Sequence, residues 1–504
     1  MATSIKPNTQ EHSHTHIPNN HAVIPTPVRL DADNSLSGKG ITIAFLDSGF
    51  YPHPDLTDPA NRIVEFVDIT DPDAELDADR TPESWDWHGT QTSVVAAGNG
   101  HLSDGVYRGV AHNANVVLVK VSARGKITDE NIARGIRWVI ANKSRLDIRI
   151  LSISLGGDED SGHESSIVDQ AAEDAVKAGI VVVVAAGNAG CTDRPRPLPP
   201  ANAPSVITVG GYDDKNLIGD QNFDLYCSSF GPTVDGILKP EIIAPAIWVA
   251  APILPGTDFY KRAEALSQLA VTPDYLLKSI VNLTNKREPL PSSLADCLWE
   301  TAELNESLKL QPPDAIRNAA SMLLKENKIV ATHYQHVDGT SFAAPIVASV
   351  VALMLEANSS LTPAMVKHIL ISASDRIPGA DLLRQGYGVM NARRTVETAC
   401  KEEHKFNGDL LLSPLQTNNR VFFCCHYDEA TRISLVGDFN GWNPDITKFI
   451  RSSNGLWHAE IEVPRMGRYC YKFIVDESSW IEDRLNPRKE LDGFGGFNSI
   501  LEVK

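Results

Sequence analysis

Four short stretches of the sequence carry side chains whose types and settings could together cleave an acyl bond. Asp47 ends the apolar run ITIAFLD, and His88 precedes an alanine-rich segment in WHGTQTSVVAAG. Asn188 follows the apolar run VVVVAAG, and Ser341 opens another alanine-rich segment in DGTSFAAPIVAS. A serine hydroxyl is a weak nucleophile unless an imidazole takes its proton and a buried carboxylate orients that imidazole. Asp47, His88 and Ser341 supply these three groups.

The negative oxygen that such an attack creates needs hydrogen-bond donors that are already in place. The Asn188 amide and the backbone N–H of Ser341, at the positive end of a helix, can supply them. Taken singly, each residue has a simpler explanation, as a turn former at a strand end, a helix-start residue or a helix cap. Their order along the chain, with glycine near each of them, favours one catalytic set.

The segments around these residues have the composition of a parallel α/β sheet. Apolar runs without polar alternation, typical of strands buried on both faces, lie at residues 41–47, 115–121, 148–156 and 180–188. Two segments with helical spacing lie between these runs, at residues 129–142 and 166–178. Open α/β sheets bind ligands at the carboxyl ends of their strands, where Asp47 and Asn188 stand. We therefore predict a doubly wound α/β domain.

Three other regions differ in texture. Residues 1–38 are polar at their start and are predicted to be a flexible N-terminal tail. Residues 253–329 are leucine-rich with helical spacing and several prolines, which predicts a small helical insertion. After a polar linker at 401–417, residues 418–504 form short β-type runs separated by Gly, Asn and Pro turns.

Composition restricts the class of protein. The chain has 504 residues and a formal net charge of −18, so nucleic acid and anionic membrane are not expected as partners. The sequence contains no run of about 18 apolar residues, so no transmembrane helix is expected. The first residues lack the basic start and apolar core of a secretory signal. The seven cysteines include no CxxC pair and are odd in number, so free thiols in the cytoplasm are expected.

The four stretches resemble those of the subtilisin-like serine peptidases (subtilases), whose triad runs in the chain order Asp, His, Ser. SISLGG, SSFGPT, KPEIIAP and GYGVMNARRTV resemble further core segments of that family, so the resemblance covers residues 39–400 apart from the insertion. It implies a mostly parallel sheet with helices on both faces and serine endopeptidase activity. It also implies that Asp47 orients His88, that His88 is general base and acid, that Ser341 attacks, and that Asn188 donates to the oxyanion.

The same resemblance implies a set of substrate contacts. The stretch expected to pair with a peptide as an added strand comprises Ser154, Leu155, Gly156 and Gly157. Ala185, Ala186 and Gly187 are expected to line the pocket for the residue before the scissile bond. Gly89 and Gly339 are expected to give backbone freedom beside the reactive groups.

The chain departs from the family pattern in places. Gln91 stands where many relatives have a second histidine, and Ala246 where they commonly have glycine. The insertion replaces what is usually a short connection before the nucleophile. We hypothesise that it forms a lid or docking surface near the cleft. The alternative is a surface element that takes no part in substrate binding. No folding propeptide is recognised before Asp47, as in the intracellular members.

Within the connection between Asp47 and His88, eight carboxylates crowd residues 68–86, namely Asp68, Asp71, Asp73, Glu75, Asp77, Asp79, Glu83 and Asp86. The segment DPDAELDADR lacks the glycine at the sixth position and the glutamate at the twelfth that a calcium loop needs. A solvated acidic loop is expected, with a structural calcium site or selection of basic substrates as alternatives. No metal or other cofactor is predicted.

Near the C-terminus, ISLVGDFNGWNP, YKFIVDESSW and GGFNSILEV resemble the glycogen-binding modules of branching enzymes and AMP-activated kinase β subunits. That resemblance implies an immunoglobulin-like β-sandwich that binds α-glucan such as glycogen through aromatic faces and a few polar groups. The matching residues are Trp442, Lys472, Trp480 and Asn498. Two alternatives stay open: the tryptophans could pack in the sandwich core or in a turn, and the module could dock a protein.

These observations predict a cytoplasmic serine endopeptidase that acts on polypeptides and carries a module for α-glucan or protein docking. The alternative, from a different class, is a catalytically idle glucan-binding or interaction protein on a subtilase scaffold.

Overall fold

The structure is a computed structural model of the chain, and it describes residues 23–77, 79–219, 223–278, 294–401, 413–416, 420–427, 429–451, 456–462 and 464–503. Three groups of predictions therefore lie wholly or partly outside the described residues: the tail at 1–22, residues 279–293 of the insertion, and most of the linker at 401–417.

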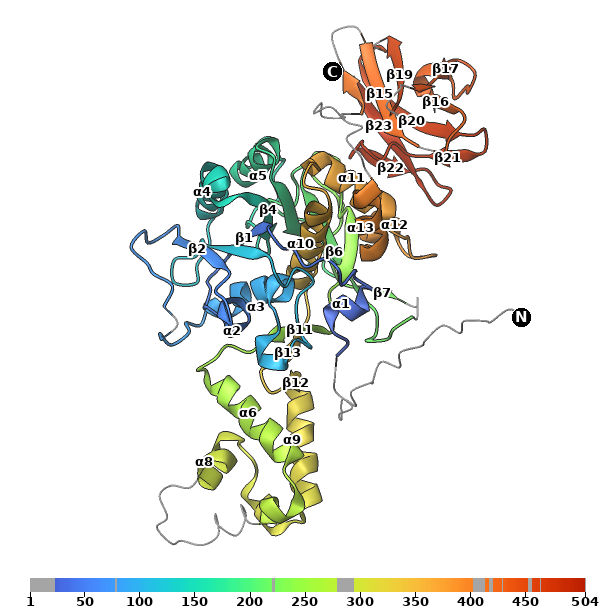
Figure 1. Cartoon of the computed structure of the whole chain (residues 1–504). Helices are drawn as coiled ribbons and strands as arrows, with labels where there is room; N and C mark the ends of the chain where they lie inside the picture. The colour runs from blue at the N-terminus through green and yellow to red at the C-terminus, as the bar shows by residue number, and fades with distance from the viewer. Residues whose placement is uncertain are drawn as a thin grey trace, which may run out of the picture.

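A parallel sheet forms the centre of the first domain (Figure 1). Its strands follow the order β10 (Ile242–Pro245), β6 (Ile207–Asp213), β5 (Val181–Ala185), β4 (Ile148–Ile153), β1 (Thr42–Asp47), β3 (Asn115–Lys120), β2 (Ile63–Asp68). The short β7 (Asp224–Leu225) adds to β6 in the antiparallel sense. Strands β1, β3, β4 and β5 lie in the predicted apolar runs and are almost completely buried. Burial on both faces explains why those runs show no polar alternation.

Helices cover both faces of this sheet, as predicted. On one face α3 (Asp86–Ala97) and α10 (Thr340–Ala357) pack against the strands, with α11 (Pro363–Ala373) and α13 (Ala392–Lys401) beside α10. On the other face lie α4 (Asp129–Leu146) and α5 (Ile167–Lys177). Short helices are α1 (Thr26–Arg29), α2 (Pro54–Thr57) and α12 (Leu382–Gln385).

Helix α10 is the central helix of this core. Within the described residues it is the one helix long and apolar enough to cross a membrane, although no such helix was expected from the sequence. Of its 18 residues 83% are buried inside the protein, so its apolar surface is accounted for by packing.

The folded domain begins closer to the N-terminus than the predicted boundary at residue 39. From Val23 onward the chain packs on the domain, and Val23 itself is 2% exposed. Arg29 donates to the carbonyl oxygens of Ile247 and Trp248 and pairs with Asp214 at 3.1 Å. A buried guanidinium needs such partners, so the predicted tail is wrong for residues 23–38.

The expectation of free thiols is also wrong for two cysteines. Cys191 and Cys227 form a disulfide, with their Cα atoms 5.3 Å apart. The backbone N–H of Gly190 donates to the carbonyl of Cys227, so the loop after Asn188 lies directly on the segment before Ser228. The two residues are 36 positions apart, and nothing in their spacing marks them as partners. Because disulfides are typical of oxidising compartments, the cysteine argument for a cytoplasmic protein no longer holds.

The predicted helical insertion leaves the domain between β11 (Val249–Pro252) and β13 (Tyr334–Val337), which pair with each other. A third strand, β12 (Ile329–Ala331), pairs with β13. Beyond this small sheet lie α6 (Asp258–Val271), α8 (Leu294–Thr301) and α9 (Pro313–Glu326), which extend away from the domain in Figure 1. They enclose a hydrophobic cluster of their own around Leu266, Trp299 and Ile316.

The C-terminal module consists of two antiparallel sheets, as predicted. One has the order β14 (Leu415–Gln416), β15 (Arg420–His426), β19 (Leu456–Glu462), β18 (Ile450–Arg451). The other has the order β17 (Thr447–Lys448), β16 (Ile433–Gly437), β20 (Gly467–Val475), β23 (Phe497–Val503), β22 (Lys489–Leu491), with β21 (Ser479–Ile481) beside β20. Strand β14 is the outer strand of its sheet, so Leu415 and Gln416 belong to the module and not to the predicted linker.

The module lies against the peptidase-like domain near α11 and α12 (Figure 1). The N–H of Leu238 in β9 (Leu238–Lys239), which pairs with β8 (Gly231–Pro232), donates to the carbonyl of Pro487. Ile237 forms an isolated bridge with Arg488, so backbone pairing joins the two domains.

Candidate active site

Asp47 and His88 meet at the edge of the sheet where β1 ends and α3 begins. His88 Nδ1 lies 2.7 Å from Asp47 Oδ1. The Asp47 side chain is 2% exposed, whereas that of His88 is 22% exposed and can reach a substrate. The backbone N–H of Ser48 donates to Asp47 Oδ1 at 2.7 Å, and the Thr92 hydroxyl donates to Oδ2 at 3.1 Å. Both oxygens of the carboxylate are thus fixed, and the imidazole is oriented with them.

The Asp47 carboxylate changes the titration of His88. Burial lowers the pKa of His88, but the negative charge of Asp47 and its hydrogen bond raise it by more, so the pKa lies above its usual value. The carboxylate therefore stabilises the imidazolium form that a general base becomes after it takes a proton.

Gly89 is required by close packing rather than by backbone freedom. A Cβ atom at this position would lie 2.2 Å from the carbonyl oxygen of Gly49 and 2.9 Å from Cβ of Asp47. Glycine therefore lets α3 start directly against the loop after β1, which brings His88 to Asp47. At Gly339 the predicted freedom is confirmed, because φ is +138°.

Ser341 occupies the first turn of α10, two residues after Gly339. Its hydroxyl donates to the carbonyl oxygen of Ser154 at 3.3 Å. No hydrogen bond joins it to His88 in the part of the chain that the structure describes. The next residue, Phe342, has its ring centroid 6.0 Å from that of His88, which places the start of α10 beside the imidazole.

A proline inside α10 ties this serine to the neighbouring strand. Pro345 has no N–H, so the carbonyl of Ser341, four residues earlier, lacks its helical partner. The Ser154 hydroxyl donates to that carbonyl at 2.8 Å. Pro345 and Ser154 together hold the turn that carries Ser341 against the end of β4.

Asn188 lies just beyond β5 and is held by the residue before Ser341. Its Oδ1 accepts from the backbone N–H of Thr340 at 3.0 Å and from the Thr340 hydroxyl at 3.1 Å. An atom that accepts from a backbone N–H must be the amide oxygen, so Nδ2 is the group left to donate. A Cβ built on Gly339 would lie 3.7 Å from Nδ2, so this donor sits beside the Ser341 turn.

The predicted substrate strand continues from the end of β4. Gly156 is exposed, whereas Ser154 is buried and tied to Ser341. Gly157 donates its N–H to the carbonyl of Pro199 at 2.7 Å, so this N–H already has a partner inside the domain. The backbone around Leu155 and Gly156 is the part of the predicted stretch that stays accessible.

The predicted pocket walls follow β5. Ala186 is buried, with its N–H donating to the carbonyl of Val209, and Gly187 donates its N–H to the Thr340 hydroxyl at 3.1 Å. The wall, Asn188 and the Ser341 turn therefore form one connected unit.

Three residues that position the site were missed from the sequence: Ser48, Thr92 and Thr340. Thr92 stands four residues after His88, on the same face of a helix, and that spacing was a usable signal. Thr340 is completely buried beside Ser341. Its role depends on the position of the loop carrying Asn188, 152 residues away, which spacing cannot reveal.

The acidic connection contains two structural ion pairs. Asp68 pairs with Lys120, and Asp86 pairs with Arg80 at 2.8 Å. In the described residues, no three His, Cys, Asp or Glu side chains gather as they would around a metal ion. The basic-substrate alternative stays a prediction.

The predicted sugar-binding residues of the C-terminal module lie on one of its two sheets or on the turns of that sheet. The rings of Trp442 and Trp480 stack with their centroids 6.3 Å apart and their planes 26° apart. Trp480 is 51% exposed, and neither ring belongs to the hydrophobic core of the sandwich, so packing in that core is wrong for both, whereas packing in a turn stays an alternative. Trp442 donates its indole N–H to Asp438 at 2.9 Å. Lys472 pairs with Asp492.

Asn498 lies close to Lys472 through the sheet. Tyr471 of β20 pairs with Ser499 of the antiparallel strand β23. Lys472, one residue after Tyr471, therefore lies opposite Asn498, one residue before Ser499. All four predicted residues therefore lie on the sheet that contains β16, β20 and β23 or on its connecting turns.

Comparison with known proteins agrees with this architecture. Residues 38–388 match the profile of the subtilase family, and residues 412–488 match that of carbohydrate-binding module 48 (isoamylase N-terminal domain). The chain is 34% identical over 370 residues to the serine protease AprX of Bacillus subtilis, covering 72% of this chain and 67% of that protein. It is 31% identical over 214 residues to thermitase of Thermoactinomyces vulgaris, covering 42% of this chain and 65% of that one.

Among solved structures, a protease from Pseudoalteromonas arctica is similar at 22% identity, with a TM-score of 0.48, over 76% of this chain and 96% of that chain. The family profile spans well over half of the sequence, and the motifs around Asp47, His88 and Ser341 fall inside it. The chain therefore belongs to the subtilase family of serine peptidases, with a C-terminal module of carbohydrate-binding family 48.

Proposed function

We propose that this chain is a serine endopeptidase that works through Asp47, His88, Ser341 and Asn188. The observation that carries the proposal is the 2.7 Å contact between Asp47 and His88 beside the Ser341 turn. His88 Nε2 takes the hydroxyl proton as Ser341 Oγ attacks the scissile carbonyl, and the imidazolium then protonates the leaving amine. In the second half of the reaction His88 takes a proton from water, which attacks the acyl-enzyme, and then returns that proton to Ser341 Oγ as the acid product leaves.

The attack requires the Ser341 hydroxyl to exchange its partner from the Ser154 carbonyl to His88. Rotation about χ1 moves Oγ without moving the backbone, which Gly339, Pro345 and Ser154 hold in place. Catalytic hydrogen bonds of this kind commonly tighten only when substrate is bound.

The developing oxyanion is proposed to accept from Asn188 Nδ2 and from the backbone N–H of Ser341. Thr340 holds the Asn188 oxygen from the opposite side, so the amide need not reorganise during the reaction. The peptide is proposed to lie as an added strand along Leu155 and Gly156, with Ala186 and Gly187 at the wall of its pocket.

Labelling with a fluorophosphonate probe tests the proposal. The parent should be labelled and Ser341→Ala should not, while Ser349→Ala, a buried serine on the same helix, serves as the matched control. Absence of Ser341-dependent labelling in folded protein would favour the idle scaffold.

We further propose that the C-terminal module binds α-glucan. The support is the stacked pair of the half-buried Trp442 and the exposed Trp480, because aromatic faces are what pyranose rings pack against. Docking of a protein is the alternative. Co-sedimentation with glycogen should be lost in Trp442→Ala and Trp480→Ala, and equal sedimentation of mutants and parent would refute sugar binding.

A further inference from the structure

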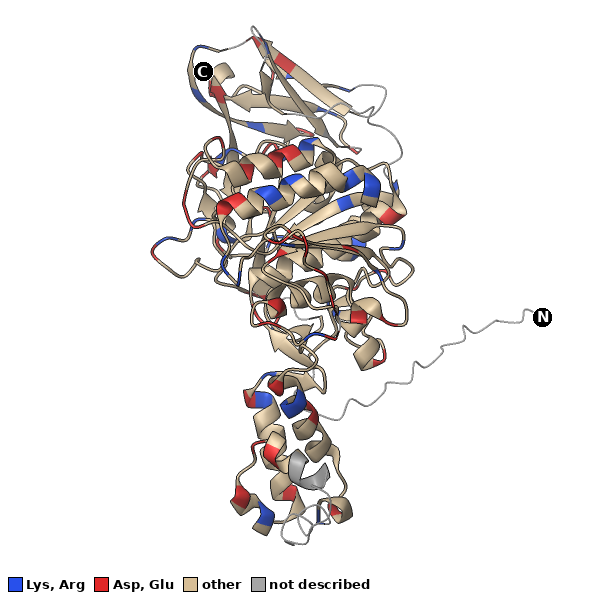
Figure 2. Ribbon diagram, turned by 90° about the vertical axis from the view of Figure 1, so that its left-hand side faces the viewer, with Lys and Arg blue, Asp and Glu red and all other residues tan. Residues whose placement is uncertain are grey.

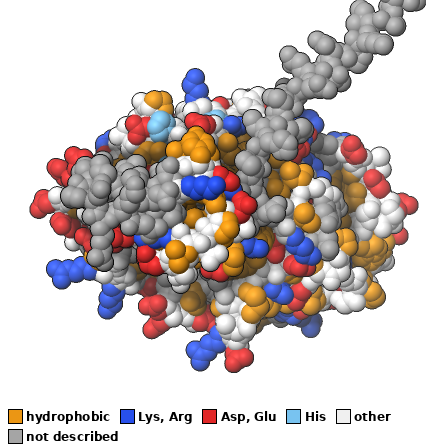
Figure 3. All heavy atoms as spheres, turned by 90° about the horizontal axis from the view of Figure 1, so that it is seen from below, with side chains coloured by type: hydrophobic (Ala, Val, Ile, Leu, Met, Phe, Trp, Pro, Cys, Tyr) orange, Lys and Arg blue, Asp and Glu red, His pale blue; other side chains and the backbone are white. Residues whose placement is uncertain are grey.

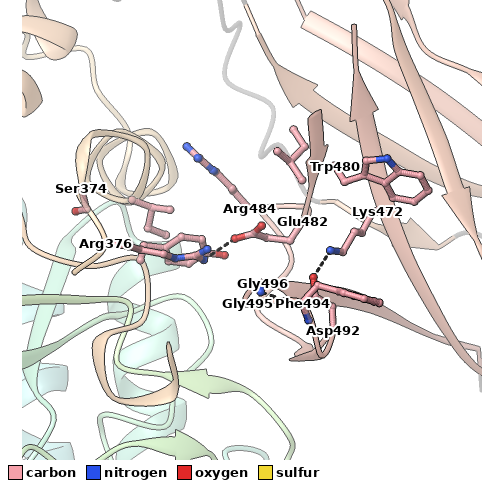
Figure 4. Close-up of a pocket in the computed structure, with 13 residues that line it drawn as sticks. Ser374, Arg376, Lys472, Trp480, Glu482, Arg484, Asp492, Phe494, Gly495 and Gly496 are labelled. Atoms are coloured by element: carbon pink, nitrogen blue, oxygen red, sulfur yellow. Dashed lines mark hydrogen bonds and ion pairs between the residues drawn. The ribbon is translucent and has the colours of Figure 1, made fainter. Parts of the chain in front are cut away.

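A cavity of about 680 Å³ lies between the peptidase domain and the C-terminal module (Figure 4). The module lines it with Lys472, Trp480 and Phe494, among others, and the peptidase domain with Ser374, Arg376 and Tyr387. Its volume lies in the range of sites that bury a small organic ligand, roughly 300–1,000 Å³. Both domains are therefore needed to form it.

The lining suits a ligand rich in hydroxyl groups. Trp480 is 51% exposed and Phe494 is 95% exposed, so two aromatic side chains are open to contact. Charged groups stand beside them, since Lys472 pairs with Asp492 and, across the domain boundary, Arg376 pairs with Glu482 at 2.7 Å (Figure 4). Ion pairs of this kind offer both donors and acceptors to sugar hydroxyls.

Arg484 adds a further hydrogen-bond donor to the lining of the cavity. No carboxylate in the described part of the chain pairs with Arg484, whose side chain extends from the module toward the peptidase domain in Figure 4. A guanidinium carries five N–H donors, so Arg484 can donate to the oxygens of a ligand.

We propose that this cavity is a glucan subsite built jointly by the two domains. Trp480 belongs both to the cavity and to the stacked pair with Trp442, so a glucan chain on that pair can continue into the cavity. The inference rests on the proposed glucan binding and extends it, because it makes the peptidase domain part of the sugar site. A linear α-1,4-linked oligosaccharide is the ligand whose repeated pyranose faces and hydroxyls fit this arrangement.

The test measures binding of maltoheptaose to the full-length chain by isothermal titration calorimetry. Ser374 lies at the end of α11 on the peptidase side, where its hydroxyl donates to the carbonyl of Leu370. Ser374→Trp and Ser374→Leu place bulk in the cavity, Ser374→Ala removes the hydroxyl without adding bulk, and Trp442→Ala removes the module's own platform. Ser341 labelling by a fluorophosphonate reports that each variant is folded.

We expect Ser374→Trp to raise the dissociation constant at least about tenfold, with Ser374→Leu intermediate and Ser374→Ala near the parent. If Trp442→Ala weakens binding while both bulky Ser374 variants bind as the parent does, the joint subsite is wrong and glucan binding by the module stands. If the parent itself binds no maltoheptaose, the proposed glucan function and the joint subsite both fail.

Discussion

At the scale of single residues, the site depends on how firmly the Asp47 carboxylate is held. Ser48 and Thr92 each donate to one of its oxygens, and His88 contacts the same oxygen as Ser48. A carboxylate fixed in this way selects one tautomer of the imidazole, with the proton on Nδ1 and the lone pair on Nε2. That is the tautomer a general base needs.

Asp47→Asn should change both the rate and its pH dependence. Since neutral His88 is the active form and Asp47 raises its pKa, kcat/KM of the parent should fall on acidification with a midpoint above about 6.5. In Asp47→Asn burial still lowers the pKa of His88 but the raising contributions are gone, so the midpoint should move to lower pH. We expect kcat to fall by about 10⁴-fold. A pH–rate profile with an unmoved acid limb would contradict this assignment.

Thr340→Val should impair catalysis through Asn188. The substitution keeps the shape of the side chain and removes the hydroxyl that donates to Asn188 Oδ1. We expect kcat to fall by roughly tenfold with KM unchanged, less than the 10²–10³-fold expected for Asn188→Ala. Thr340→Ser, which keeps the hydroxyl, should restore the rate.

A double-mutant cycle separates this role from a merely structural one. If Thr340 acts through Asn188, its substitution should cost little once Asn188 is alanine. Costs that add fully in the double variant would show that the two residues act independently.

The residues that act on a substrate were easier to predict than those that support them. Asp47, His88, Asn188 and Ser341 each stand within two residues of a glycine, near a strand end or a helix start, where local sequence restricts the choice of residue. Thr340 and Ser154 bond to partners far along the chain, and their roles follow from packing alone.

At the scale of elements, a buried charge cluster joins α11 to the sheet. Glu241 precedes β10, and its Oε1 accepts from Lys239 at 2.7 Å and from Lys367 of α11 at 2.6 Å. The two ammonium groups also donate to the carbonyl of Val206. Burial raises the pKa of Glu241, but the charges of the two lysines lower it by more, so the net pKa is below its usual value.

Glu241→Gln should destabilise the peptidase domain. The substitution leaves the buried ammonium group of Lys239 and the partly buried one of Lys367 without this counter-charge, which costs about 3–5 kcal/mol in comparable cases. Because the pKa of Glu241 is lowered on folding, its contribution is present above its unfolded pKa of about 4.3 and is lost as the pH falls below that value. Calorimetric unfolding at pH 7 should therefore show a lower midpoint for the variant, with a smaller difference in acid.

Glu65→Gln provides the matched control. Glu65 forms an exposed pair with Arg145, so its loss should change stability by less than about 1 kcal/mol. Equal midpoints for Glu241→Gln and the parent would contradict the importance of the cluster.

The elements that were predicted well are those whose burial marks them in the sequence. Strands β1, β3, β4 and β5 are continuous apolar runs, and α4 and α9 show a clear apolar face. The three-residue β12 and the four-residue β11 and β13 could not be predicted, because strands this short are specified by their pairing. The disulfide between Cys191 and Cys227 likewise required the fold to bring two loops together.

At the scale of the whole molecule, the insertion and the module stand at opposite ends of the peptidase domain (Figure 1). Basic and acidic side chains are mixed along the outer helices (Figure 2). The excess of negative charge, a net −18 for the chain, is therefore not concentrated on any one of these helices. Seen from below, the end of the molecule that the insertion forms shows hydrophobic side chains among charged ones (Figure 3). Exposed apolar residues of the insertion include Val271, Tyr275, Leu310 and Met322.

The root of the insertion contacts both reactive elements. Gln91 of α3, three residues after His88, donates its amide to the carbonyl of Pro252 at the end of β11 at 2.9 Å. On the other side β13 leads directly into Asp338, which pairs with Lys328 at the end of the insertion. The distal helices pack around a core to which the root contributes only Ile253 and Ile329 among its fully buried residues.

Replacing residues 258–326 with a short Gly-Ser linker should therefore spare the chemistry and change substrate choice. Since β11, β13 and Gln91 stay in place, kcat/KM for a short peptide should stay within about threefold, less than 1 kcal/mol of barrier. For a folded protein substrate, which extends beyond the cleft and can meet the exposed apolar residues of the insertion, we expect at least about a fivefold change, near 1 kcal/mol. Met322→Gln with Leu310→Gln, which keeps the helices and alters only their surface, should reproduce part of that change. Unchanged rates for both substrates would mean that the insertion is neither a lid nor a docking surface.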